Sequence, residues 1–230
     1  LHSYFLREAD TSVPVIYHVD RIRDGRSLAT RRVLAKQHGE AIFNMSVSFQ
    51  AAEEGLEHQA PMPDAPPPES VPTNYDRLQA YKQRSSHPAV DFLLQLDRPI
   101  ERREVDHVDL LEPQAHAGMQ RTWFRADGEL GDDPVLHQAV LTYASDYGLL
   151  ESSFNTHGES FLTEKLIIAS LDHAVWFHQP IRADRWMLYV TQSPRTSGGR
   201  GLNFGHIYSE EGALLASVAQ EGLMRIRKPQ

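Results

Sequence analysis

The chain has 230 residues, no cysteine and a formal charge of −8. The lack of cysteine excludes disulfides, thiolate zinc sites and a cysteine nucleophile, and the acidic balance argues against a nucleic-acid-binding surface as the main function. Because 40% of the residues are apolar, a sizeable core can form, and no apolar run approaches the roughly 18 residues of a membrane span. We expect a soluble protein of one large domain or two small ones.

Two stretches, one towards each end of the chain, share a sequence pattern. In both, apolar or aromatic runs are broken by proline, glycine and aspartate, which predicts four strands joined by turns. A chance similarity between two β-rich stretches is the alternative. The corresponding runs are residues 2–6, 14–17, 25–27 and 39–43 in the first copy and 173–177, 186–189, 199–201 and 212–216 in the second.

A segment of different composition separates the two copies. Residues 57–72 hold six prolines, several acids and little that could pack, so we expect a surface loop or linker there. Residues 75–84 predict a short helix with Asn74 as its cap.

The second copy has an upstream part that the first copy lacks. A strand is expected at residues 121–125, and Asp133 with Pro134 predicts the start of a helix after a turn. The apolar positions of this helix recur at helical intervals, and the small residues among them suit a helix that a sheet encloses. These positions are Leu136, Ala139, Val140, Tyr143, Ala144 and Tyr147. A further apolar strand follows at residues 166–169.

A strand, a buried helix and a run of antiparallel strands make the hotdog architecture, in which a sheet curls around one helix. We therefore expect an α+β double hotdog, with a first unit at 1–56, a proline-rich connection at 57–95 and a second unit at 96–230. The first unit lacks its N-terminal strand and helix in this chain. We expect the native protein to continue upstream of Leu1, since a hotdog sheet without its helix exposes a large apolar face.

One polar residue interrupts an apolar strand face near the end of the chain. Residues 214, 216, 218, 220, 222 and 224 alternate onto one face, and only Gln220 among them is polar. Its counterpart in the first copy is Val47, an ordinary core residue. A buried glutamine must find partners or destabilise the fold, so Gln220 is a candidate functional residue. The alternative is that it bonds a local backbone carbonyl.

Asp146 is the second candidate, because it lies late in the predicted central helix and close to its apolar stripe. The helix dipole is unfavourable for a carboxylate there, which makes the group a better base. The alternative is an exposed, solvated aspartate. Ser170 and Asp172 follow on a strand; a strand serine is usually a core-edge residue, and Asp172 could bond a turn or the neighbouring His173.

Six segments together resemble the type II acyl-CoA thioesterases, the family of bacterial thioesterase II and the peroxisomal acyl-CoA thioesterase. The resemblance covers nearly the whole chain outside the proline-rich loop. The segments are His2-Ser3-Tyr4-Phe5-Leu6-Arg7, Leu28-Ala29-Thr30-Arg31-Arg32-Val33, Ser48-Phe49-Gln50, residues 137–146 ending in Tyr143-Ala144-Ser145-Asp146, Leu171-Asp172-His173-Ala174-Val175-Trp176-Phe177-His178, and Ser217-Val218-Ala219-Gln220-Glu221-Gly222-Leu223-Met224-Arg225.

The resemblance implies that Asp146, Ser170 and Gln220 are the catalytic residues and that Asp172 is structural. Asp146 would act as general base on a water that Ser170 and Gln220 hold, and backbone amides near the amino-terminal end of the central helix are candidates for the oxyanion site. It further implies an acyl-CoA substrate, no cofactor or metal, and a homo-oligomer, either dimer or tetramer. The chain ends without a Ser-Lys-Leu address and lacks cysteine, which favours a cytoplasmic location.

Two other functions stay open. Residues 131–137 partly match a hotdog enoyl-CoA hydratase signature, although its asparagine is missing and Asp132 is more simply a helix cap. A non-catalytic acyl-CoA-binding module is the other alternative, because the first unit is incomplete.

Overall fold

The computed structural model describes residues 1–96, 98–162 and 165–227. Its centre is one antiparallel sheet in the order β2-β3-β4-β1-β8-β11-β10-β9-β6-β5, with β7 paired to β11 beside this path. The strands are β1 (His2–Phe5), β2 (Ile16–Asp24), β3 (Leu28–Gln37), β4 (Glu40–Gln50), β5 (Ile100–Glu104), β6 (Gln120–Ala126), β7 (Leu166–Ser170), β8 (Asp172–Phe177), β9 (Met187–Ser197), β10 (Arg200–Ser209) and β11 (Leu214–Ile226).

The sheet confirms the internal repeat. Strands β1 to β4 and β8 to β11 each follow the same order, and the two sets meet where β1 pairs antiparallel with β8. This seam joins Ser3 to His173, two residues far apart in the sequence. The strands expected at 121–125 and 166–169 are present as β6 and β7, whereas β5 was not predicted. The two copies therefore lie side by side in one continuous sheet, and the pairing of β1 with β8 joins them.

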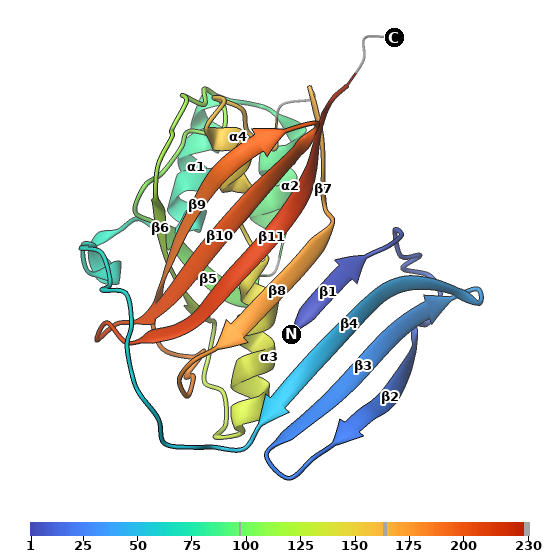
Figure 1. Ribbon diagram of the computed structural model, residues 1–230. Coiled ribbons are helices and arrows are strands. Elements are labelled where there is room, and N and C mark those ends of the chain that lie inside the picture. Colours follow the sequence, from blue (N-terminus) through green and yellow to red (C-terminus); the bar gives the residue numbers. More distant parts are fainter. Residues whose placement is uncertain (97, 163–164, 228–230) are drawn as a thin grey trace.

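Helix α3 (Pro134–Ser145) is the central helix of the second copy, and Figure 1 shows it in yellow behind β8 to β11. Its N-cap is Asp133, whose carboxylate accepts from the backbone N–H of Val135 at 2.9 Å. The expectation that Asp132 caps the helix is wrong, because Asp132 instead pairs with Arg182. The α+β sheet wrapped around a buried helix matches the expected hotdog unit.

The predicted buried stripe of α3 is confirmed for Ala144, which is buried, and for Val140, which packs against the core, but it is wrong for its other four positions. Leu136 is 41% exposed, Tyr143 51% and Tyr147 37%, whereas the buried residues are His137, Leu141, Ala144 and Ser145. The prediction failed because the helix carries apolar residues on several faces and because polar residues can be buried when bonded. His137, for example, accepts from the backbone N–H of Ala183 and bonds the carbonyl of Gly131.

The core of the second copy lies between α3 and the sheet. The largest buried cluster joins Leu141 of α3 to apolar side chains of β6, β8, β9, β10 and β11, with Met187 and Ile207 at its centre. None of the helices in the described ranges has both the length and the apolar character that crossing a membrane requires.

Two helices occupy the connection between the copies. Helix α1 (Asn74–Arg84) begins one residue earlier than predicted, and its cap is Thr73 rather than Asn74. Thr73 forms a reciprocal capping box with Asp76, which satisfies two backbone donors at once. Helix α2 (Pro88–Gln95) and the short α4 (Glu151–Asn155) were not predicted.

The proline-rich segment is better packed than its composition predicts. Pro68 and Val71 are buried, and Met62 and Ala65 pack against a cluster that contains Trp123 and Trp186. The expectation of a loop that packs little is therefore wrong for residues 62–71. Polar donors from the sheet hold the loop by its carbonyls, which proline residues still possess. These contacts are Trp123 Nε1 to the Pro66 carbonyl at 2.8 Å, Arg103 to the Pro68 carbonyl at 2.8 Å and Arg121 to the Asp64 carbonyl.

Trp123→Phe is expected to loosen this loop. The substitution removes the indole N–H that donates to Pro66 and keeps most of the buried ring, so we expect a loss of about 1–3 kcal/mol in the free energy of unfolding. Urea denaturation measures this loss, and limited proteolysis should show faster cleavage in 57–71. Trp176→Phe is the matched control, because Trp176 is 43% exposed and should change stability by less than about 0.5 kcal/mol. Equal effects of the two substitutions would contradict the anchoring role.

Candidate active site

Three different elements bring the candidate catalytic residues to one place. Asp146 is the C-cap of α3, Ser170 ends β7, and Gln220 lies in the middle of β11. The alternation predicted for the last strand is confirmed, since Ala216, Val218 and Gln220 are all buried on the core face. Gln220 is 1% exposed, while the Asp146 side chain is 47% exposed. The site therefore joins a solvent-accessible carboxylate to a buried amide.

Asp146 Oδ1 is the point where the three side chains converge. Gln220 Nε2 donates to it at 2.5 Å, and Ser170 Oγ lies 3.5 Å away, at the outer limit of a hydrogen bond. The other end of the amide, Gln220 Oε1, is buried and has no partner among the described residues. A charged acceptor strengthens the Gln220 bond, so the amide orientation is fixed by Asp146.

A fourth residue, His173, lies beside this carboxylate, whereas the sequence indicates for it only a bond with Asp172. Its Nε2 is 2.8 Å from Ser145 Oγ, and its Nδ1 is 4.0 Å from Asp146 Oδ1. The Ser145 hydroxyl donates to the carbonyl of Thr142, so its oxygen accepts from His173, which assigns the imidazole proton to Nε2. The unprotonated Nδ1 is buried, has no partner within the described ranges, and faces the site. An isolated histidine on a strand face gave little signal for this role.

His173 makes stability depend on pH. Burial lowers its pKa from the ordinary 6.5, and the charges of Asp146 and Asp172 oppose that shift. Below about pH 6.5 the unfolded chain binds a proton that the folded chain takes up only at lower pH, so stability falls as pH falls. His173→Gln should flatten this dependence by at most about 1.4 kcal/mol per pH unit. Urea unfolding between about pH 7.5 and 5 tests it. The exposed His58 provides a matched control, and equal slopes in wild type and His173→Gln would contradict the expectation.

The structure also bears on the role predicted for Asp172 and on the place expected for the oxyanion site. Asp172 accepts from the backbone N–H of Glu221 at 2.7 Å, a contact between β8 and β11 that suits the structural role expected of it. The oxyanion site proposed near the helix amino terminus does not fit α3. Asp146 follows the last residue of this 12-residue helix, and a rise of 1.5 Å per residue places the two ends about 18 Å apart.

The site lies next to the seam between the copies. A small cavity of about 200 Å³ is lined by Gln220 and His173 together with Ser3 of β1. Ser3 Oγ donates to the carbonyl of His173 at 2.8 Å. The first copy therefore contributes to the wall of a cavity that Gln220 also lines, although the candidate catalytic residues all come from the second copy.

Comparison with solved structures identifies the class of fold. The chain aligns with a conserved protein with a hot dog fold from Alicyclobacillus acidocaldarius at a TM-score of 0.74 and 21% identity, covering 99% of this chain and 78% of that one. It aligns with an acyl-CoA thioesterase II, TesB2, from Mycobacterium marinum at a TM-score of 0.80 and 43% identity, covering 99% of this chain and 80% of that one. The fold is thus an α+β double hotdog.

Sequence comparisons identify the family. A family model for acyl-CoA thioesterases matches residues 90–223, and one for the acyl-CoA thioesterase N-terminal domain matches residues 1–50. Acyl-coenzyme A thioesterase 8 of Mus musculus is 40% identical over 100% of this chain and 73% of its own length. Acyl-CoA thioesterase 2 of Haemophilus influenzae is 34% identical over 97% of this chain and 78% of its own length. The chain belongs to the acyl-CoA thioesterase family and is a thioester hydrolase.

Proposed function

We propose that the protein hydrolyses acyl-CoA thioesters to a carboxylic acid and coenzyme A, with Asp146, Ser170 and Gln220 as its catalytic residues. The observation that carries the assignment is the 2.5 Å contact of Gln220 Nε2 with Asp146 Oδ1, which joins a buried polar residue to an accessible carboxylate. A buried amide with one end unpaired is unusual in a strand core. Because the Gln220 amide lies beside Asp146, a potential base, it can orient that carboxylate.

The chemistry requires one water and no covalent intermediate. Asp146 accepts a proton as the water oxygen attacks the thioester carbonyl carbon, which gives a tetrahedral intermediate with a negatively charged oxygen. Collapse of that intermediate breaks the carbon–sulfur bond, and the coenzyme A thiolate leaves and takes up the proton. The Gln220 amide and the Ser170 hydroxyl are suited to orient the water and the carboxylate, since Gln220 Nε2 and Ser170 Oγ both lie around Asp146 Oδ1.

Thiol release from short-, medium- and long-chain acyl-CoAs tests the proposed function. Release at a rate proportional to enzyme, with one free acid formed per thiol, is the expected result. Hydration of crotonyl-CoA without thiol release would favour the hydratase alternative. Tight acyl-CoA binding without turnover, in a protein that is folded by circular dichroism, would favour a binding module and contradict the proposal.

Three finer assignments are part of the same proposal. The chain divides into a first unit at 1–56, a connection at 57–95 and a second unit at 96–230, it assembles as a homo-oligomer, and it acts in the cytoplasm. Light scattering of the purified protein tests the assembly, with a dimer or tetramer as the expected result.

A further inference from the structure

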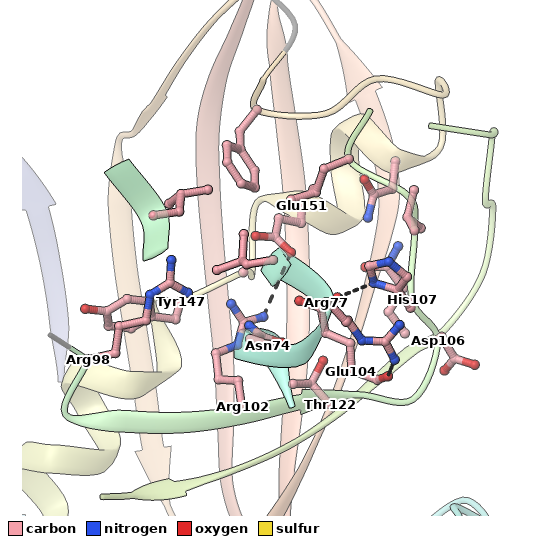
Figure 2. Close-up of a pocket in the computed structure, with 18 of the residues that line it drawn as sticks. Asn74, Arg77, Arg98, Arg102, Glu104, Asp106, His107, Thr122, Tyr147 and Glu151 are labelled. Atoms are coloured by element: carbon pink, nitrogen blue, oxygen red, sulfur yellow. Dashed lines mark hydrogen bonds and ion pairs between the residues drawn. The ribbon is translucent and has the colours of Figure 1, made fainter. Parts of the chain in front are cut away.

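A larger cavity lies apart from the candidate catalytic residues. Its volume is about 470 Å³, and α1, α2, β5 and the segment after α3 enclose it. Figure 2 shows Arg98 and Tyr147 towards one end of it and His107 towards the other. Asp146, Ser170 and Gln220 are not among its lining residues, although the neighbouring Tyr147 is. The volume falls in the range of small-molecule sites, about 300–1,000 Å³.

Residues that line this cavity carry buried polar atoms without partners in the described ranges. Among the described residues, six buried side-chain atoms lack a hydrogen-bond partner, and three of these belong to lining residues. They are Asn74 Oδ1, Arg77 Nε and Gln120 Nε2. Gln120 is only 8% exposed. Buried polar groups in proteins are nearly always bonded, so these atoms mark a place where a polar ligand would complete the bonding.

The cavity also holds arginines whose charge is at most partly offset by carboxylates. Within the part of the chain that the structure describes, Arg98 forms no hydrogen bond or ion pair, although burial lowers its pKa. The nearest carboxylate of Arg102 is Glu151, 3.9 Å away (Figure 2). The Arg102 guanidinium lies against Gly148, where the backbone has φ +80° and a side chain would collide with it. A glycine is thus needed to let this cation reach the cavity.

Three carboxylates line the cavity, and they do not cancel these charges. Asp106 is paired with Arg121, which lies outside the cavity. Burial raises the pKa of Glu151, which favours its neutral form. Burial also acts to raise the pKa of Glu104, but the hydrogen bond with His107 at 2.7 Å and nearby cations lower it overall. Glu104 is therefore an anion that bonds His107 and offsets part of the charge of Arg102 and Arg77. With Arg77, Arg98 and Arg102 present, the cavity favours an incoming anion.

Apolar side chains form the remaining wall. Leucines from α1 and from α2 and its C-cap line the cavity together with two phenylalanines, one from α4 and one after it; they are Leu78, Leu93, Leu96, Phe154 and Phe161. Such a wall suits an aliphatic chain, whereas a planar guanidinium suits a carboxylate bound through two oxygens. An apolar wall together with guanidinium groups favours a ligand that has both an aliphatic chain and a carboxylate.

We infer that this cavity binds the carboxylate of an aliphatic chain, with Arg98 and Arg102 at the carboxylate and the leucines along the chain. Two sources carry this chemistry. One is a free fatty acid, the acid that thioester hydrolysis releases. The other is the far-end carboxylate of an acyl-CoA made from a dicarboxylic acid, and this second source alone rests on the proposed function.

Calorimetric titration of the whole chain with decanoate tests the binding, with decan-1-ol as the uncharged probe. We expect decanoate to bind at least tenfold more tightly than decan-1-ol, and Arg98→Met to weaken decanoate binding at least tenfold. Arg98 has no hydrogen-bond or ion-pair partner among the described residues, so its substitution leaves none of their groups unpaired and the variant should fold. The matched control is Arg195→Met, because Arg195 is exposed and outside the cavity. If folded wild type does not bind decanoate, or Arg98→Met binds it equally well, the inference is overturned.

Kinetics separate the two sources. If the far-end carboxylate enters the cavity, Arg98→Met should lower the ratio of kcat/KM for suberoyl-CoA to that for octanoyl-CoA at least tenfold, and Arg195→Met should not. An unchanged ratio together with decanoate binding assigns the cavity to free fatty acid. If wild type hydrolyses no thioester, the proposed function fails, while the calorimetry still decides the cavity. The double variant Arg102→Met/Glu151→Gln, which removes both partners of one ion pair, should repeat the loss of decanoate binding.

Discussion

Asp146→Asn is expected to lower kcat for thiol release by about 10²–10⁴-fold, the usual contribution of a positioned general base. The substitution keeps the shape of the side chain and removes its ability to accept a full proton. Because the side chain is 47% exposed, the variant should keep its thermal midpoint and the KM for acyl-CoA. The measurement is steady-state thiol release with the acyl-CoA that wild type hydrolyses fastest, alongside thermal unfolding of both proteins.

The matched control for that experiment is Asp133→Asn. Asp133 is also an exposed aspartate of α3, but it caps the opposite end of the helix, where asparagine is as good a cap as aspartate. It should leave kcat and stability unchanged. If Asp146→Asn keeps kcat within about threefold of wild type, or if both variants lose activity alike, Asp146 is not the base.

The fold was largely predictable because it repeats a local pattern. Strand alternation and turn residues locate β1 to β4 and β8 to β11 twice over, so each copy supports the other. The connection was less predictable, since its stability comes from distant donors. The loop carbonyl of Pro66 is held by Trp123, and nothing in the local sequence of residues 57–72 signals that contact.

The candidate site was predictable to the extent that each residue broke a local rule. Gln220 stood out as a polar residue in an apolar alternation, and Asp146 as an acid at a helix end, and both lie together in the structure. Ser145 and His173 broke no such rule strongly enough, because their pairing depends on α3 crossing β8. The prediction of the buried face of α3 was mostly wrong for the same reason. Tertiary structure, and not periodicity, decides which side of this helix packs against the sheet.

Gln220→Leu is expected to reduce activity while leaving the fold about as stable as before. Leucine fills similar space in the β11 core face and removes Gln220 Oε1, a buried acceptor without a partner in the described ranges. Removing this unpaired acceptor offsets the loss of the hydrogen bond to the half-exposed Asp146 carboxylate, so the free energy of unfolding should stay within about 1 kcal/mol of wild type. Loss of the contact with Asp146 should lower kcat at least about tenfold, because the water and the carboxylate lose their orientation.

A second buried glutamine provides the matched comparison. Gln37 is 5% exposed, and all of its polar atoms are engaged: Nε2 donates to the carbonyls of Asp10 at 2.8 Å and Val13 at 2.7 Å, and Oε1 accepts from the Asp10 N–H at 2.9 Å. Gln37→Leu should therefore cost about 1–3 kcal/mol in unfolding free energy and leave kcat per folded molecule unchanged. Opposite responses are expected: Gln220 sustains activity at little benefit to stability, and Gln37 sustains stability alone. If Gln220→Leu instead loses stability as Gln37→Leu does, and its activity follows the folded fraction, Gln220 is a structural residue.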